Sequence, residues 1–110
     1  MYCNRDEIKV KSMTNFVISV FSATKRIPLG RVSTYTAVAR SVGHPNAARA
    51  AGNALNKNIQ QLVPCHRVIR SDGSVGGFAR GTREKIKLLR KEGIVVRDEK
   101  VEPRFILRSP

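Results

Sequence analysis

The sequence STYTAVARSVGHPNAARAAGNALNK, residues 33–57, contains two short helical patterns separated by a turn. The first helix is expected over residues 35–42 and ends at Gly43, because glycine readily adopts the left-handed conformation found after helix ends. The second helix is expected over residues 47–57, after the turn His44-Pro45-Asn46. Two short helices joined by a tight glycine-containing turn are typical of a helix-turn-helix, whose second helix contacts DNA.

Polar residues stand where each of these helices would begin. Ser33 or Thr34 can accept a hydrogen bond from the first turn of the first helix, and Asn46 can do the same for the second. The second helix is rich in alanine and carries a single arginine, Arg49. Such a bare helix lets the backbone approach DNA closely and suits sequence-independent contact in a narrow groove. The alternative is a small-residue helix that packs in the core.

Two further helices are predicted outside the helix-turn-helix. Apolar residues recur at helical spacing over residues 14–23 and again over residues 82–92. Thr82 is positioned to cap the later helix, and Gly93 is positioned to end it.

Short strands are expected in the second half of the chain. Asp72-Gly73 predicts the turn of a hairpin over residues 69–75. Residues 94–96 and 104–107 are expected to pair as a terminal hairpin, joined around residues 98–100, which would serve as a wing. The predicted fold is therefore α+β and mainly α, a winged helix-turn-helix with short β-hairpins.

The length and charge of the chain indicate one domain that binds a polyanion. With 110 residues, one domain is expected, at residues 14–110 after a polar segment at residues 1–13. The net charge is +13, and residues 8–71 contain ten Lys and Arg but no Asp or Glu. Together with the helix-turn-helix, this distribution predicts a nucleic acid as the partner. No helix pairs a basic face with a large apolar one, which disfavours a membrane surface. A generally basic soluble protein is the alternative.

The two cysteines, Cys3 and Cys65, and the two histidines, His44 and His66, lack the spacing of a zinc finger. The sequence therefore predicts no metal site. The polar N-terminus lacks the apolar core of a signal peptide, and no apolar run reaches membrane-spanning length. We expect a cytoplasmic, nucleoid-associated protein (nuclear in a eukaryote) with reduced thiols, and a disulfide between the cysteines is the alternative.

The sequence Pro64-Cys65-His66-Arg67-Val68 places a thiol directly beside an imidazole and a guanidinium. Cysteine reacts as its thiolate, and neighbouring cationic or basic groups favour that form. The surrounding segment contains no acid that would oppose this effect. Cys65 is therefore a candidate nucleophile rather than a thiol that only fills the core.

Residues 16–93 resemble the O6-alkylguanine-DNA alkyltransferases, which repair alkylated guanine by moving the alkyl group onto their own cysteine. PCHRV resembles the active-site motif of that family. The other matching segments, in chain order, are VSTY at 32–35, PNAARA at 45–50, GNALNKN at 52–58, SDGSVGGF at 71–78 and KEG at 91–93. The resemblance implies a winged-helix DNA repair domain that uses no cofactor.

The resemblance also implies a role for each matching residue. Cys65 would attack the alkyl carbon, His66 would take its proton through a water, and Glu92 would hold His66. Tyr35 would donate a hydrogen bond to N3 of the base, and Asn58 would tie the hinge between the recognition helix and the active-site segment. The other implied pocket residues are Val68, Phe78, Ala79 and Arg80. The implied DNA-binding residues are Arg49, Ala47, Ala48, Thr36, His44, Asn46 and Ser71.

Because the alkyl carbon lies within the base stack, the resemblance implies that the nucleotide is flipped out and that Arg49 fills the space. The product would be a thioether that water does not hydrolyse, so each molecule would act once. The expected partner is duplex DNA containing O6-alkylguanine, with O4-alkylthymine as a second substrate. We expect a monomer, alone or in association with another DNA repair enzyme.

The chain departs from the family pattern in three places. We expect only the C-terminal catalytic domain of the family, without its usual N-terminal domain. The family's pocket loop reads close to Gly-Tyr-Ser-Gly-Gly, whereas this chain has Gly77-Phe78-Ala79-Arg80-Gly81, which lacks both hydroxyls and adds a cation. The segment 58–64 is one residue shorter than in familiar members. The changes in the loop and in this segment predict a different pocket size and a different tolerance of large alkyl groups.

Three other function classes are open to the sequence. An alkyltransferase-like lesion sensor binds and flips alkylguanine without transfer and replaces the cysteine, often with tryptophan, so Cys65 argues against it. An ordinary winged-helix regulator would carry more base-reading side chains on its recognition helix. A Cys-His-Glu hydrolase would need an oxyanion hole, for which the sequence has no signature.

Overall fold

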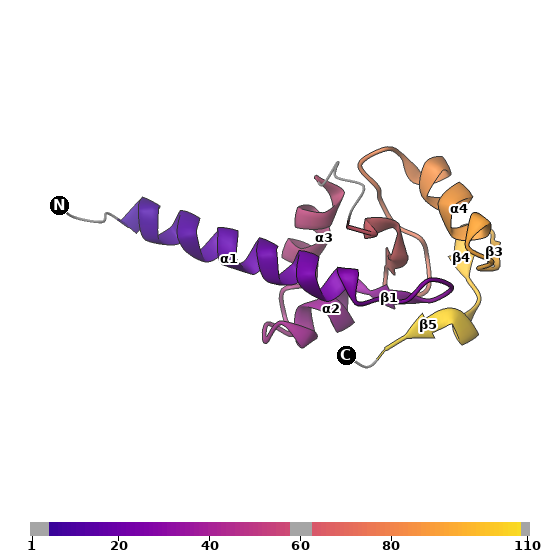
Figure 1. The fold of residues 1–110 in the computed structure, drawn as a ribbon, viewed down its shortest axis with the longest axis horizontal. Coiled ribbons are helices and arrows are strands. Elements are labelled where there is room, and N and C mark those ends of the chain that lie inside the picture. Colours follow the sequence, from indigo (N-terminus) through magenta and orange to yellow (C-terminus); the bar gives the residue numbers. More distant parts are fainter. Residues whose placement is uncertain (1–4, 58–62, 109–110) are drawn as a thin grey trace.

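The computed structural model describes residues 5–57 and 63–108, and side chains from residue 15 onward. The described residues form a mainly helical fold with two small sheets (Figure 1). The α-helices are α1 (Arg5–Lys25), α2 (Tyr35–Ser41), α3 (Ala48–Asn56) and α4 (Thr82–Lys91). The strands are β1 (Val32–Thr34), β2 (Val68–Ile69), β3 (Val96–Arg97), β4 (Lys100–Val101) and β5 (Ile106–Leu107), and the short 3-10 helices are η1 (Cys65–Arg67) and η2 (Pro103–Phe105).

Helix α1 is longer than the predicted helix over 14–23, because it begins at Arg5. Residues 5–25 contain no Gly or Pro to interrupt it. The prediction followed the apolar spacing, which starts only at Phe16. Toward its N-terminus, α1 extends away from the rest of the fold (Figure 1).

The helix-turn-helix is confirmed, with α2 and α3 as its two helices. The Thr34 side chain accepts a hydrogen bond from the Ala37 amide at 3.1 Å, as predicted for a cap. The prediction that Asn46 caps the next helix is wrong. Ala47 occupies the cap position of α3 without a side-chain hydrogen bond, because the turn closed by the Ala47 amide and the His44 carbonyl delays the helix by one residue.

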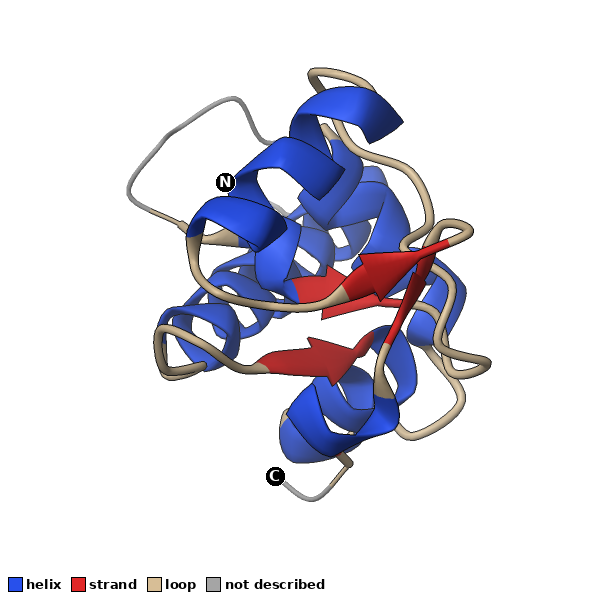
Figure 2. Cartoon of the chain, turned by 90° about the vertical axis from the view of Figure 1, so that its right-hand side faces the viewer, coloured by secondary structure: helices blue, strands red, loops and turns tan. Residues whose placement is uncertain are grey.

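Strand β1 is the central strand of a three-stranded parallel sheet in the order β2-β1-β5 (Figure 2). Ser33 pairs with Val68 on one side, and Val32 pairs with Ile106 on the other. Segments that are distant in the sequence therefore meet at β1. This ladder fixes η1, which directly precedes β2, relative to α2, which directly follows β1.

The predicted pairing of residues 94–96 with residues 104–107 in a terminal hairpin is wrong. Strand β3 pairs with β4 instead, since Asp98 and Glu99 both have positive φ, 51° and 60°, as a two-residue hairpin turn requires. The β3–β4 hairpin leaves β5 for the parallel sheet.

The predicted hairpin over 69–75 forms only as a turn. The Arg70 amide donates to the Ser74 carbonyl, and the Ser74 amide donates to the Asp72 carboxylate at 2.9 Å. Ile69, however, pairs with β1, and Ser74 forms an isolated bridge with Lys100. The turn residues were therefore correctly identified, but their strands pair elsewhere.

Helix α4 begins after Gly81 and ends before Gly93, whose φ is +86°. Gly93 therefore stops the helix as predicted. Thr82 does not cap it, because its hydroxyl donates to the Gly76 carbonyl at 3.4 Å instead. Leu89 is fully buried in a core group that includes residues of both sheets, whereas Ile86 and Leu88 are half-buried.

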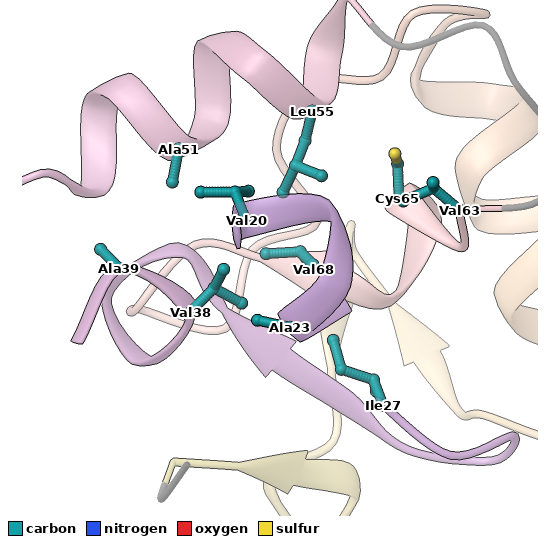
Figure 3. Close-up of a cluster of buried hydrophobic side chains, with 10 residues drawn as sticks. All are labelled: Val20, Ala23, Ile27, Val38, Ala39, Ala51, Leu55, Val63, Cys65 and Val68. Carbon is teal, nitrogen blue, oxygen red and sulfur yellow. The ribbon is translucent and has the colours of Figure 1, made fainter. Parts of the chain in front are cut away.

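The core is formed by two groups of buried apolar side chains. One group joins α1, α2, α3 and η1, and Val20, Leu55 and Val68 lie within it (Figure 3). In α3 only one face is buried, by Ala51 and Leu55, so the helix both packs in the core and keeps an exposed face. In the described part of the chain, no helix combines the length and apolar character needed to cross a membrane.

Candidate active site and DNA-facing surface

Cys65 is the first residue of η1 and is only 5% exposed. It lies at the edge of the first core group beside Val63 (Figure 3). The backbone on either side is held by hydrogen bonds from the Cys65 amide to Val63 and from the Val68 amide back to Cys65. The thiol is therefore held by the parallel sheet and the core together.

His66 and Arg67, the next two residues of η1, converge on one carboxylate at the end of α4. Glu92 Oε2 lies 2.7 Å from His66 Nε2 and 3.0 Å from Arg67 Nη2, and Glu92 Oε1 lies 2.9 Å from Arg67 Nε. Arg67 Nη1 also donates to the Ile27 carbonyl at 3.0 Å. The contact predicted between His66 and Glu92 is thus present, and Arg67 completes it as a two-point partner of the carboxylate.

The charge of Glu92 decides how His66 can act. Burial alone would raise the pKa of Glu92, but hydrogen bonds from Arg67 and His66 and attraction to both groups outweigh it, so its pKa is lowered. An ionised carboxylate only accepts hydrogen bonds, so the hydrogen lies on His66 Nε2. The Nδ1 atom of a neutral His66 is then available to accept a proton.

Tyr35 is the first residue of α2, directly after β1. Its ring lies against Gly52 of α3 and against Gly76. A Cβ atom added at either glycine would lie 3.5–3.6 Å from the nearest atom of the Tyr35 ring. Its hydroxyl is 3.2 Å from Lys85 Nζ and 3.5 Å from the Gly77 carbonyl. Burial raises the pKa of Tyr35 to about 12, so the phenol remains protonated and can donate at neutral pH.

Lys85 is fully buried, although it is one of five basic residues in α4. Its ammonium donates to Tyr35 Oη and, at 3.0 Å, to the Gly77 carbonyl. Burial lowers the pKa of Lys85 to about 7, although attraction to Cys65 opposes this effect. The sequence contained a signal for this position, since Lys85 precedes the buried Leu89 by four residues and shares its helix face.

The remaining pocket residues differ in exposure. Val68 is fully buried in the same core group as Cys65, so its side chain contributes to the packing that holds the site. Phe78 is half-buried against the first core group, whereas Ala79 and Arg80 are exposed. The Arg80 guanidinium lies 5.4 Å from the centre of the Phe78 ring. The cation that this chain adds to the loop therefore lies over the ring of its neighbour.

The exposed face of the helix-turn-helix carries the residues predicted to contact DNA. Arg49 is exposed at the start of α3, and Ala47 and Ala48 beside it are half-buried. The Thr36 and Ser71 hydroxyls hydrogen-bond to each other at 2.8 Å. A hollow of about 360 Å³ opens on this face, lined by Tyr35, Thr36, Ala48, Arg49, Gly52, Asn53, Asn56, Arg70, Ser71 and Gly77.

The lining of this hollow does not include three of the predicted DNA-binding residues, His44, Asn46 and Ala47. His44 is exposed and its ring meets Phe16 of α1 edge-on, with centres 5.6 Å apart, and Asn46 is exposed in the same turn. Asn58 lies outside the described residues. A larger groove of about 750 Å³ runs between α1 and α3 and includes His44, but Cys65 and Glu92 do not line it. Cys65 and Glu92 do not line the smaller hollow either, so neither opening by itself identifies the reactive site.

A family model described as "6-O-methylguanine DNA methyltransferase, DNA binding domain" matches residues 15–94. A methylated-DNA–protein-cysteine methyltransferase of Methanosarcina acetivorans is 47% identical over 73% of this chain and 52% of its own length. One from Saccharolobus islandicus is 44% identical over 84% of this chain and 59% of its own length. A bifunctional methyltransferase/endonuclease of Picrophilus torridus is 40% identical over 76% of this chain and 28% of its own. The chain thus spans little more than half of the first two relatives.

Solved structures resemble the fold closely. The S. pombe protein Atl1 in complex with damaged DNA containing O6-carboxymethylguanine has a TM-score of 0.74 and 32% identity, over 86% of this chain and 96% of Atl1. The Mycobacterium tuberculosis protein OGT in complex with DNA has a TM-score of 0.69 and 40% identity, over 72% of this chain and 49% of OGT. The likeness thus extends to proteins with DNA bound.

Proposed function

Because the chain belongs to the 6-O-methylguanine DNA methyltransferase family, we propose that it repairs duplex DNA by moving an alkyl group from O6-alkylguanine to Cys65. The observation that carries this proposal is the buried thiol of Cys65 directly before His66, whose imidazole is held by Glu92. The proposal extends to O4-alkylthymine, which presents the same kind of alkyl–oxygen bond.

The first step is the loss of the thiol proton. Glu92 holds His66 through Nε2, so Nδ1 can receive the Cys65 proton, through a water in the way the family resemblance implies. The carboxylate then stabilises the imidazolium that forms. Arg67 keeps Glu92 ionised for this task.

The second step is the displacement itself. The Cys65 sulfur forms a bond to the alkyl carbon, the bond from that carbon to O6 breaks, and the electron pair stays with the base. Tyr35 is a suitable proton donor to the base, since its pKa of about 12 keeps the hydroxyl protonated. The thioether product is stable in water, so each molecule acts once.

The base must leave the duplex to reach Cys65. The hollow on the helix-turn-helix face, with Tyr35 and Arg49 in its lining, is the proposed entry for the flipped nucleotide. Arg49 is exposed and can enter the space that the nucleotide leaves. The kinship with a bifunctional methyltransferase/endonuclease supports action alongside a second repair activity.

A second candidate function is lesion recognition without transfer. It is favoured by the match to nearly the whole of Atl1, which has been seen with DNA containing O6-carboxymethylguanine. Cys65 and its neighbour His66 favour transfer over this alternative.

Intact-mass spectrometry after incubation with a duplex containing one O6-methylguanine tests both candidates. We expect the mass to rise by one added methyl group, located on Cys65 and absent from Cys65→Ala. Cys3→Ala is the matched control and should be methylated like the wild type. Tight lesion binding without a change in mass would refute transfer and support the recognition function.

A further inference from the structure

Lys85 is the one fully buried charged side chain among the described residues, and the proposed reaction has not assigned it a role. A buried ammonium is costly unless it is hydrogen-bonded, and Lys85 donates to two acceptors, Tyr35 Oη at 3.2 Å and the Gly77 carbonyl at 3.0 Å. Both acceptors belong to the lining of the DNA-facing hollow. The Lys85 ammonium thus contacts two residues that line the proposed base pocket.

The hydrogen bonds around Tyr35 determine where its phenol proton can point. An ammonium has three donors and no acceptor, so Tyr35 Oη is the acceptor in its contact with Lys85. The Gly77 carbonyl is a weak partner for the phenol, because it lies 3.5 Å away and already accepts from Lys85. The Tyr35 proton is therefore free to turn toward a ligand in the hollow.

A neutral Lys85 would have the opposite effect. An amine carries a lone pair and can accept a hydrogen bond from Tyr35, which would turn the phenol proton away from the pocket. The charged and titratable groups that act on Lys85 are Tyr35 from α2, Cys65 from η1 and Arg70 after β2. A thiolate at Cys65 favours the ammonium, and Arg70 disfavours it. The proton on Lys85 is thus coupled to the state of the nucleophile.

We propose that Lys85 is a positioning residue that acts through Tyr35, by directing the phenol proton toward the base and replacing that proton after it has been transferred. This inference rests on the proposed function. When the bond between the alkyl carbon and O6 breaks, the base anion takes the Tyr35 proton, and the phenolate takes one from the Lys85 ammonium. Lys85 is left as a neutral amine, while the proton from the Cys65 thiol is on His66, so protons and charge balance.

The first test follows Tyr35 directly and needs no alkyl transfer. The chain has two tyrosines and no tryptophan, so Tyr2→Phe leaves Tyr35 as the single phenol in the near-ultraviolet spectrum. In this background we expect the Tyr35 band to shift with a midpoint near pH 7, the pKa of Lys85. Lys85→Met should abolish the shift, whereas Lys87→Met, at an exposed position of the same helix, should retain it.

The second test measures single-turnover transfer to Cys65 as a function of pH. The ratio of the wild-type rate to the Lys85→Met rate should be about tenfold or more at pH 6 and should approach one at pH 9, where Lys85 is neutral. Because Lys85 acts through Tyr35, Lys85→Met should slow a Tyr35→Phe protein no further. A merely structural role predicts a ratio that does not change with pH.

The two readouts separate the inference from the proposed function. Transfer with a constant ratio, or a Tyr35 band that does not respond to Lys85, overturns the inference and leaves the function intact. If the wild type adds no alkyl group at any pH, the proposed function fails, and the absorbance titration alone decides whether Lys85 controls Tyr35. Lys85→Met is nearly isosteric and removes a buried charge, so we expect it to fold.

Discussion

Replacing Lys85 by methionine should change the stability of the protein in a pH-dependent way. The pKa of Lys85 is about 7 in the folded protein, because burial lowers it from its ordinary value of 10.5. Each tenfold change in proton affinity corresponds to about 1.4 kcal/mol. Keeping the charge in the folded protein below pH 7 therefore costs about 5 kcal/mol relative to the unfolded chain.

The sign of the effect follows from the two protonation states. Between pH 7 and pH 10.5 the unfolded chain keeps the Lys85 proton while the folded protein loses it, so the wild type gains stability as pH rises. Lys85→Met has no such group. Its free energy of unfolding relative to the wild type should therefore fall by about 2 to 3 kcal/mol between pH 7 and pH 9. The loss of the hydrogen bonds to Tyr35 and Gly77 adds a constant cost and leaves this slope unchanged.

Urea unfolding followed by circular dichroism at several pH values measures this difference. Lys87→Met is the matched control, because Lys87 is exposed on the same helix, and it should track the wild type at every pH. A difference between Lys85→Met and the wild type that stays constant from pH 6 to pH 9 would refute the reasoning. Lys85 would then carry its charge in the folded protein at no special cost.

Three further predictions concern other parts of the molecule. Affinity for duplex DNA, measured by fluorescence anisotropy, should fall steeply as the salt concentration rises. Arg49→Ala should weaken binding and reduce the slope of log affinity against log salt concentration by about one, and binding that does not depend on salt would contradict this. Because the pKa of Glu92 is lowered in the folded protein, its contribution to stability is present above the unfolded pKa of about 4.3 and is lost as pH falls further. Glu92→Gln should therefore slow alkylation of Cys65 and remove this acid sensitivity from thermal melts, and equal acid sensitivity of both proteins would argue against it. Gly76→Ala should lower the free energy of unfolding in urea by about 1 to 3 kcal/mol, because the φ of Gly76 is +72° and the added carbon would lie 3.3 Å from the Arg70 side chain. Gly52→Ala is the control, since Gly52 lies in α3 and the added carbon would make an ordinary contact with Tyr35 at 3.6 Å. This variant should be as stable as the wild type or more stable.

The helix-turn-helix could be predicted because its signals are local. Thr34 and Gly43 act on the residues next to them, and the apolar spacing of α2 and α3 is short and regular. The strands could not be paired correctly, since their partners are distant in sequence. Ile106 pairs with Val32, and strands of two or three residues carry too little pattern to indicate a partner.

The site could be predicted only in part. The contact of His66 with Glu92 followed from the family resemblance, and the structure confirms the contact. The burial of Lys85 could not be predicted from its residue type, because charged side chains are seldom fully buried and α4 contains several of them. Its spacing from Leu89 carried the opposite signal, and burial of a hydrogen-bonded lysine depends on acceptors that only the folded chain brings together.

The pairing of β1 with β2 has a consequence for how this domain can tolerate changes in length. Ser33 pairs with Val68 across the two strands. Tyr35 follows Ser33 by two residues, and Cys65 precedes Val68 by three. The distance between the two reactive side chains is therefore set by this strand pairing and not by the thirty or so residues of chain that connect them. Insertions or deletions between α3 and η1 should therefore leave the separation of phenol and thiol unchanged, so the length of this connection can vary without moving the reactive pair.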